Sequence, residues 1–285
     1  MKDFHVHIYS APGNTLNYDD FLRHQKDSGI DGGNIFSFSP ACFQPDADKQ
    51  HCWQARLEQL MECVKNVPGY NPVFWIDPQE ADFTKQLDAC EAQGIRAIKI
   101  ICSHYYPKDI LPQLQQIADK NMGIIFHTGI IWAENALAEY SRPINFEHLI
   151  KLKNARFSMA HISWPWCEEC ISLYGRFETH NKDYPDRKVT MFIDTTPGTP
   201  FARRHFFLKM IYSVGYDVAH NVVWGTDSWL GPEYPKKFVQ DCIELDRKAY
   251  ADIQTMTEFP AYNPENEDLF DLAMDKNFTR FMDGK

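Results

Sequence analysis

The sequence predicts an α/β fold, a (β/α)8 barrel in a single domain, on three observations. Short β-rich apolar runs alternate with amphipathic segments along the 285 residues, as in parallel sheets covered by helices. Eight such runs precede the last helical segment, which is the number that a closed barrel needs. No G-x-G-x-x-G loop follows the first run, although the rival doubly wound sheet usually has one there.

Each predicted strand is a short apolar run, and most are bounded by Gly, Pro, Ser or Asn on at least one side. The eight runs are residues 3–9, 32–39, 72–77, 95–102, 122–128, 156–162, 189–195 and 221–227.

Between these runs, apolar residues at three- and four-residue spacing predict amphipathic helices. The clearest examples are residues 83–93, 110–120, 145–153 and 235–250. The tail, residues 266–283, has the same pattern and predicts one more helix packed on the outside of the barrel. No linker, low-complexity segment or internal repeat divides the chain, so residues 1–285 are expected to form one domain.

Composition excludes several classes of partner. The net charge is −10 and no Lys/Arg-rich block is present, which argues against nucleic acid. No apolar run approaches the roughly 18 residues of a membrane span, and no signal sequence opens the chain. We therefore expect a cytoplasmic protein that acts on a small molecule and binds neither nucleic acid nor membrane.

The first strand, in "KDFHVHIYS", contains two histidines one residue apart. Side chains at i and i+2 of a strand share a face, so His5 and His7 project together, about 7 Å apart along the backbone. Imidazoles so placed can converge on one metal ion. Taken alone, the pair is equally compatible with two hydrogen-bonded core histidines.

Three other predicted strands end in a polar residue of the kind that binds metals. His127 ends the fifth strand, His161 the sixth and Asp227 the eighth. In a barrel the carboxyl ends of all strands meet at one mouth, and strand eight neighbours strand one. Burying these groups separately would cost several kcal/mol each, and sharing a cation removes most of that cost. The pattern predicts a metal held by His5, His7, His127 and Asp227.

The motifs resemble the amidohydrolase superfamily, specifically the amidohydrolase-2 branch that includes aminocarboxymuconate-semialdehyde decarboxylase. The matching segments are "DFHVH", "FHTG", "RPINFEHLIKLKNARFSMAH", "FIDTTPG", "WGTDSW" and "AMDKNFTRFM", in the family's order over nearly the whole chain. The resemblance implies a distorted barrel with one divalent metal per chain, usually Zn²⁺ and sometimes Mn²⁺. It implies His5, His7 and His127 as ligands, Asp227 as ligand or base, and His161 as a catalytic residue. By analogy, a homodimer is expected.

The sequence departs from the family after strand six, where "HISWPW" replaces a more common His-x-Gly. This difference affects the expected substrate pocket rather than the metal. Six candidate substrate-binding residues lie on or after the strands at the predicted mouth. Lys99, in the middle of the fourth strand, is expected to face the substrate or to be ion-paired, and each of the others is equally or more often a plain loop or surface residue. The six candidates are Lys99, His104, Trp132, Arg142, Trp164 and Trp229.

The predicted site supports two reactions. In hydrolysis of an amide, lactone or ester, Asp227 would accept a proton from a metal-activated water and His161 would stabilise the developing charge. In non-oxidative decarboxylation, the same metal would bind an unsaturated or aromatic acid, with Arg142, Arg203 or Arg204 as candidate partners for its charge. A barrel that binds a metal or ligand without turnover is a third interpretation, and a two-metal centre bridged by Lys99 is a minority one.

Overall fold

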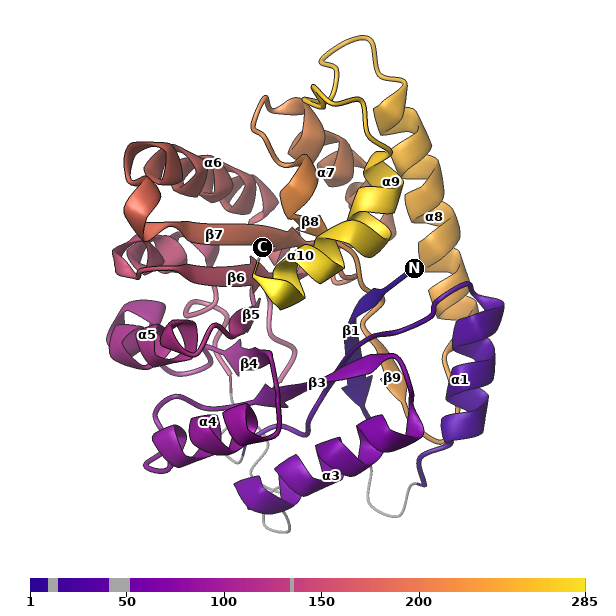
Figure 1. The fold of residues 1–285 in the computed structure, drawn as a ribbon. Helices are drawn as coiled ribbons and strands as arrows, with labels where there is room; N and C mark the ends of the chain where they lie inside the picture. The colour runs from indigo at the N-terminus through magenta and orange to yellow at the C-terminus, as the bar shows by residue number, and fades with distance from the viewer. Residues whose placement is uncertain (10–14, 41–51, 134–135, 285) are drawn as a thin grey trace.

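The strands form one parallel sheet that curls into a barrel (Figure 1). The computed structural model describes residues 1–9, 15–40, 52–133 and 136–284. The order of strands is β8-β7-β6-β5-β4-β3-β2-β1-β9, as predicted for a (β/α)8 fold. The strands are β1 (Asp3–Ile8), β2 (Gly33–Phe36), β3 (Tyr70–Trp75), β4 (Ala97–Ile101), β5 (Gly123–His127), β6 (Ala155–Met159), β7 (Val189–Asp194), β8 (Val222–Val223) and β9 (Ser228–Leu230).

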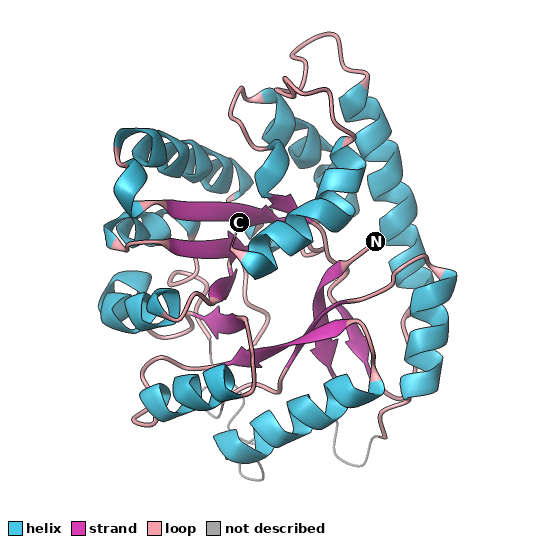
Figure 2. Cartoon of the chain, in the orientation of Figure 1, coloured by secondary structure: helices cyan, strands magenta, loops and turns pink. Residues whose placement is uncertain are grey.

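Helices surround the strands, as the cyan and magenta ribbons of Figure 2 show. Their apolar faces and the outward side chains of the strands form the main hydrophobic core. These helices are α1 (Tyr18–Asp27), α3 (Trp53–Asn66), α4 (Phe83–Ala92), α5 (Leu111–Asp119), α6 (Cys167–Asp183), α7 (Phe201–Ser213) and α8 (Lys236–Gln254). None of the described helices is both long enough and apolar enough to cross a membrane.

The connection between β5 and β6 differs from the helix predicted over residues 145–153. It is a 3-10 helix, η2 (Pro143–Lys151). Its buried residues Pro143, Phe146 and Leu149 are three positions apart, and Leu152 continues the series. This spacing matches the three residues per turn of a 3-10 helix rather than the 3.6 of an α-helix.

The predicted eighth strand is split into two pieces. β8 pairs with β7, whereas β9 pairs with β1, with Val6 opposite Ser228 and His7 opposite Trp229. Between them, the Phe4 amide donates to the carbonyl of Trp224 over 3.0 Å and closes the barrel. The interruption ends at Asp227, whose left-handed backbone (φ 56°) sets it apart from a regular strand.

The inside of the barrel is filled at the end where the strands begin. One layer of inward side chains comes from seven strands and packs against the last helix, α10 (Asn277–Asp283). This inner layer consists of Phe4, Phe36, Val73, Ala97, Ile125, Phe192 and Val223, together with Phe278, Phe281 and Met282 of α10.

The C-terminal segment therefore closes the amino-terminal end of the barrel. It continues through α9 (Leu269–Asp271) and the π-helical turn η6 (Leu272–Lys276) into α10, which lies across the strands in Figure 1. Arg156, the inward residue of β6, donates to the carbonyls of Phe281 and Met282. The predicted helix exists, but its expected position on the outside of the barrel is wrong, since its aromatic side chains enter the barrel.

On three strands, the next inward position toward the carboxyl end is polar. Lys99 follows Ala97 by two residues, His127 follows Ile125 and Asp194 follows Phe192. The apolar inner layer thus forms the floor of a polar cavity at the mouth. That the whole of 1–285 is one domain stays a prediction.

Candidate metal centre at the barrel mouth

His5, His7 and Asp227 converge at the mouth, and one ligand atom from each lies within 4.8 Å of the others. His7 Nε2 is 3.2 Å from Asp227 Oδ1, and His5 Nε2 is 3.7 Å from the same oxygen. The pairing of β1 with β9 brings the chain's first and last barrel strands together, and this places the three donors on one point. Two imidazole nitrogens and a carboxylate oxygen are a donor set that zinc commonly uses.

A buried carboxylate that the sequence analysis did not single out orients His5. Asp194, the last residue of β7, has Oδ2 3.1 Å from His5 Nδ1. It also accepts hydrogen bonds from the amide and the hydroxyl of Thr196. An Nδ1–H that donates to Asp194 leaves His5 Nε2 as the ring's free lone pair, directed at Asp227.

A second carboxylate fixes the backbone on both sides of the site. Asp3 is completely buried and accepts from the amide of His5 over 3.2 Å. It also accepts from Thr226, whose hydroxyl lies 2.6 Å and whose amide lies 2.9 Å away. Asp3 therefore ties β1, at His5, to Thr226, the residue before Asp227.

His127 and His161 lie next to this group, with their ring centroids 4.8 Å apart. The Nε2 of His127 is 3.0 Å from the carbonyl of Ile130, so it donates there and leaves Nδ1 as its acceptor. The Nδ1 of His161 is 2.9 Å from the carbonyl of Pro197, so its Nε2 is the free nitrogen. The ligand atoms of His5, His7 and Asp227 are thus closest together, and His127 stands at the edge of the group.

The backbone after β6 is unusual and turns His161 toward the mouth. His161, Ile162 and Ser163 all have positive φ, at 64°, 50° and 59°. Each such non-glycine residue costs roughly 1–2 kcal/mol. Local hydrogen bonds hold the turn, from Thr199 Oγ1 to the carbonyl of His161 and between Thr128 and Ser163, both at 2.8–2.9 Å. The departure from His-x-Gly therefore appears as strained backbone beside the site.

Burial favours the neutral form of three imidazoles at the site. It lowers the pKa of His5, His127 and His161, and the charge of Lys99 lowers all three further. Neutral imidazole is the form that binds a metal. Burial raises the pKa of Asp227, but its hydrogen bond with His7 and the positive charge of Lys99 outweigh this and lower it.

Lys99 lies inside the barrel below the donors. It is 1% exposed, and its Nζ is 3.3 Å from His5 Nε2 and 5.1 Å from the centre of the Phe36 ring. Burial lowers the pKa of its ammonium group, whereas Asp227 and Asp194 raise it. Lys99, which was predicted to be ion-paired or to face the substrate, is thus buried and contacts the predicted metal ligand His5.

A cavity of about 150 Å³ opens beside these groups. It is lined by two of the predicted substrate-binding tryptophans, Trp132 and Trp164, and by predicted metal-site residues. The full lining is His127, Thr128, Ile130, Trp132, His161, Trp164, Gly198 and Asp227. Trp229 lies outside this lining, in a neighbouring groove.

Two other predicted substrate-binding residues do not line this cavity. Arg142 pairs with Glu169 at 3.1 Å and lies over the ring of Trp166. His104 follows β4 at the expected end of the barrel, where Nδ1 is 2.9 Å from Ser103 Oγ and Nε2 is 3.7 Å from Asp77.

The alternative cationic candidate Arg204 is also engaged elsewhere. It is buried and forms an ion pair with Asp246 at 2.6 Å, and Asp246 accepts from the indole of Trp224 as well. Arg204 is therefore a structural residue that ties α7 to α8.

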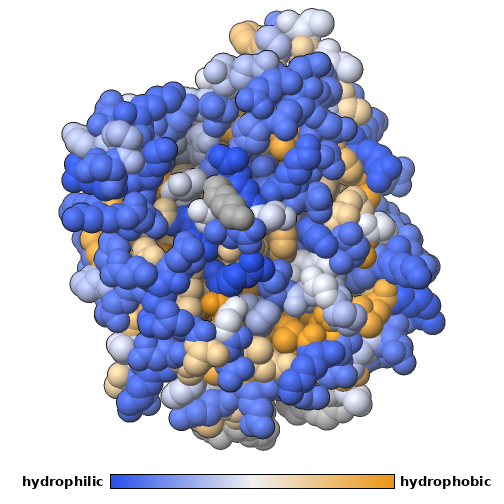
Figure 3. All heavy atoms as spheres, in the orientation of Figure 1, coloured by the Kyte–Doolittle hydropathy of each residue, from blue (hydrophilic) through white to orange (hydrophobic). Residues whose placement is uncertain are grey.

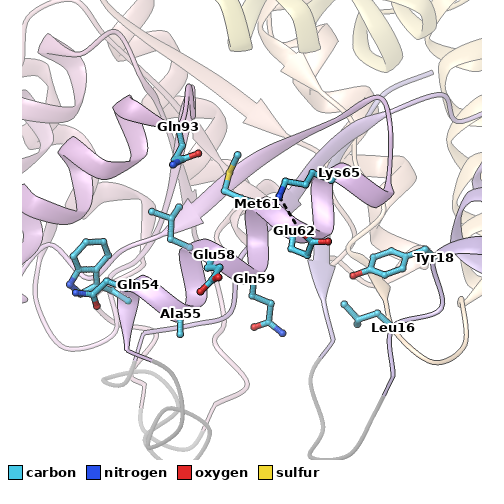
Figure 4. A pocket seen from close by; sticks show the side chains of 12 residues that line it. Leu16, Tyr18, Gln54, Ala55, Glu58, Gln59, Met61, Glu62, Lys65 and Gln93 are labelled. Atoms are coloured by element: carbon cyan, nitrogen blue, oxygen red, sulfur yellow. Dashed lines mark hydrogen bonds and ion pairs between the residues drawn. The ribbon is translucent and has the colours of Figure 1, made fainter.

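A larger hollow, of about 880 Å³, lies away from the strand ends beside α3 (Figure 4). Its charged side chains include Glu62 and Lys65, which pair with each other at 3.0 Å. The described residues that line it include no histidine, cysteine or aspartate. The surface seen in Figure 3 is mostly hydrophilic, with hydrophobic atoms gathered in its lower half. The smaller cavity at the mouth, whose lining includes His127, His161 and Asp227, is therefore the candidate site for a reaction.

The fold has clear relatives among solved structures. No protein-family model and no curated protein matches the sequence. An uncharacterized TIM-barrel protein from Bordetella bronchiseptica superposes with a TM-score of 0.62 at 16% identity, over 93% of this chain and 82% of that one. A proposed metal-dependent hydrolase from Lactobacillus casei gives 0.62 at 10% identity, over 91% and 75%.

An amidohydrolase from Burkholderia multivorans gives a TM-score of 0.62 at 6% identity, over 98% of both chains. A structure of that amidohydrolase with bound zinc gives 0.59 at 7% identity, over 87% and 90%. These comparisons confirm the predicted fold class. The chain has the TIM-barrel fold found in amidohydrolases and metal-dependent hydrolases.

Proposed function

We propose that this protein is a metal-dependent hydrolase of the amidohydrolase-2 kind, with one divalent cation at the mouth of its barrel. The observation that carries the proposal is the convergence of His5, His7 and Asp227 within 4.8 Å. The neighbours named amidohydrolase and metal-dependent hydrolase, one of them with bound zinc, support it.

The donor set fits a cation such as Zn²⁺, with Mn²⁺ as an alternative. His5 has the buried carboxylate partner that metal-binding histidines commonly have on their other nitrogen. His127 offers Nδ1 as a fourth donor, because its Nε2 is committed to the carbonyl of Ile130. Lys99 contacts the same His5 Nε2 that would bind the cation. An ammonium group at Lys99 therefore favours a single metal ion over two ions bridged by this lysine.

When bound, the cation supplies Lewis acidity and lowers the pKa of a bound water to about 7. Asp227 would act as the general base, taking a proton from the attacking water and passing it to the leaving group. The Nδ1 bond to the carbonyl of Pro197 fixes the His161 ring with Nε2 as an acceptor, and Nε2 would donate to the substrate oxygen only after it has taken up a proton. Trp132 and Trp164 bound the space for the substrate.

Hydrolysis is favoured over decarboxylation by the positions of the arginines. A decarboxylase needs a partner for its substrate's carboxylate, yet Arg142 pairs with Glu169 and Arg204 with Asp246. A neutral amide, lactone or ester places no such demand on the site. The alternative, decarboxylation of an unsaturated or aromatic acid, needs Lys99 or Arg203 to take that part.

The test is a reaction screen on zinc-loaded and manganese-loaded protein. Small lactones, esters and amides are assayed for acid release, and aromatic and unsaturated acids for CO₂ release. Hydrolysis that is lost in Asp227→Asn supports the proposal, and CO₂ release without hydrolysis contradicts it. A cytoplasmic location and a homodimer remain expectations.

A further inference from the structure

A groove of about 720 Å³ lies beside the mouth, outside the cavity described above. It is rich in aromatic and proline side chains, which come from the end of β1 at Tyr9, from β9, and from the connection into the start of α8. Its lining is Tyr9, Trp229, Pro232, Glu233, Tyr234, Pro235, Lys236, Lys237 and Phe238. Two of the aromatic rings are exposed, Tyr9 at 48% and Trp229 at 37%.

The sheet register connects this groove to the candidate metal centre. Tyr9 follows His7 by two residues, just past the end of β1, and Trp229 belongs to β9, which pairs with β1. His7 is opposite Trp229 in the ladder, and the Tyr9 amide donates to Leu230 over 2.9 Å. The groove therefore begins beside His7, at the residue that is opposite it in the ladder.

The aromatic side chains form one surface. The rings of Tyr9 and Trp229 are 6.2 Å apart, a distance at which aromatic pairs interact. Gly231 lies beneath them, since a Cβ there would be 3.1 Å from Trp229 and 3.2 Å from Tyr9. Phe238 continues this surface to Phe201 of α7, with ring centroids 6.5 Å apart.

Charge in the groove is largely balanced. Lys237 pairs with Asp241 at 2.8 Å, which leaves one lysine and one glutamate, Lys236 and Glu233, in the lining. Aromatic walls with little net charge suit a planar apolar group rather than an anion.

We propose that this groove is a specificity subsite for a neutral aromatic group of the substrate, held beside the place where the bond is cleaved. The proposal rests on the hydrolase function, which places the reacting bond at His7 and Asp227. The substrate class is then an arylalkyl ester or amide whose ring is separated from its carbonyl by a short chain.

Binding is tested first on metal-free protein, so that it does not depend on turnover. 3-(4-Fluorophenyl)propanamide is titrated by ¹⁹F NMR into the wild type, Trp229→Leu, Phe238→Ala and Phe259→Leu. Phe259 is an exposed aromatic residue beyond the carboxyl end of α8, away from the groove, and serves as the matched control. We expect about a tenfold weaker Kd in the first two variants only, equivalent to about 1.4 kcal/mol. Thermal melts confirm that each variant folds.

Absent binding, or equal binding in all four proteins, would overturn the subsite. Tighter binding of the propanoate than of the amide would overturn its preference for a neutral group. With zinc, the preference for methyl 3-phenylpropanoate over methyl propanoate is expected to fall about tenfold in Trp229→Leu. If no substrate is turned over but probe binding still depends on Trp229, the hydrolase function fails and the aromatic subsite stands.

Discussion

His7 Nε2 lies 3.2 Å from Asp227 Oδ1, although the two residues are 220 positions apart in the chain. The contact exists because β9 pairs in parallel with β1 and closes the barrel. Closure of the barrel and assembly of the candidate metal centre are therefore the same structural event. Residues that hold the two strands in place are expected to affect metal binding as well as stability.

Replacing Asp194 by Asn tests whether it orients His5 for a metal. The amide cannot supply the carboxylate charge opposite His5 Nδ1, so zinc affinity is expected to fall about 10- to 100-fold. Competition with a chromophoric chelator measures this. Asp252→Asn removes a surface carboxylate 3.1 Å from His205 Nε2 and is the matched control. Equal zinc affinities in the two variants would contradict the role of Asp194.

Gly198→Ala tests the position of His161. A Cβ at Gly198 would lie 2.8 Å from the His161 ring, so the ring or the loop must move. We expect kcat to fall about 100-fold, as for small displacements of catalytic groups, with zinc content unchanged.

Gly215→Ala is the control for this substitution. Its Cβ meets no atom within 4 Å, but its backbone has φ of 93°. It should cost about 1 kcal/mol of stability and leave kcat at the wild-type value. Similar kcat values for Gly198→Ala and the wild type would show that His161 takes no part in the reaction.

Phe281→Ala tests the closure of the barrel by α10. The ring is completely buried and packs edge-on against Phe4, with centroids 4.9 Å apart, and against Phe192. Its removal is expected to lower the free energy of unfolding by about 3–5 kcal/mol, measured by urea denaturation. Phe259→Ala, at a 71% exposed residue, should change it by less than about 0.5 kcal/mol. If Phe281→Ala lowers the free energy of unfolding only slightly, the packing of α10 into the barrel does not contribute to stability as proposed.

Much of the fold follows from local sequence pattern. Buried parallel strands are short apolar runs, and their alternation with helices fixes a barrel or a doubly wound sheet. Two features did not follow from this pattern. The apolar spacing of the tail is the same whether α10 packs outside the barrel or fills its end, and only the inner layer of side chains distinguishes the two. The break between β8 and β9 depends on the hydrogen bonds of Thr226 to Asp3, which is distant in sequence.

Part of the candidate site was also predictable from local sequence pattern. His5, His7 and Asp227 each interrupt or end an apolar strand, and the structure brings them together. Asp194 ends a strand in the same way, in "FIDT", and that polar strand end was the signal for its role. The partners of Arg142 and Arg204 could not be inferred, because Glu169 and Asp246 approach them only through the packing of separate elements.

The most direct test of the account is the zinc content of protein purified without chelator and without a metal-binding tag. Elemental analysis is expected to give about one zinc or manganese per chain, and less than about 0.1 in the His5→Ala/His7→Ala variant. About two per chain would indicate a binuclear centre with Lys99 as its bridge. No bound metal after reloading, or equal metal in the double variant, would contradict a metal centre built on His5, His7 and Asp227.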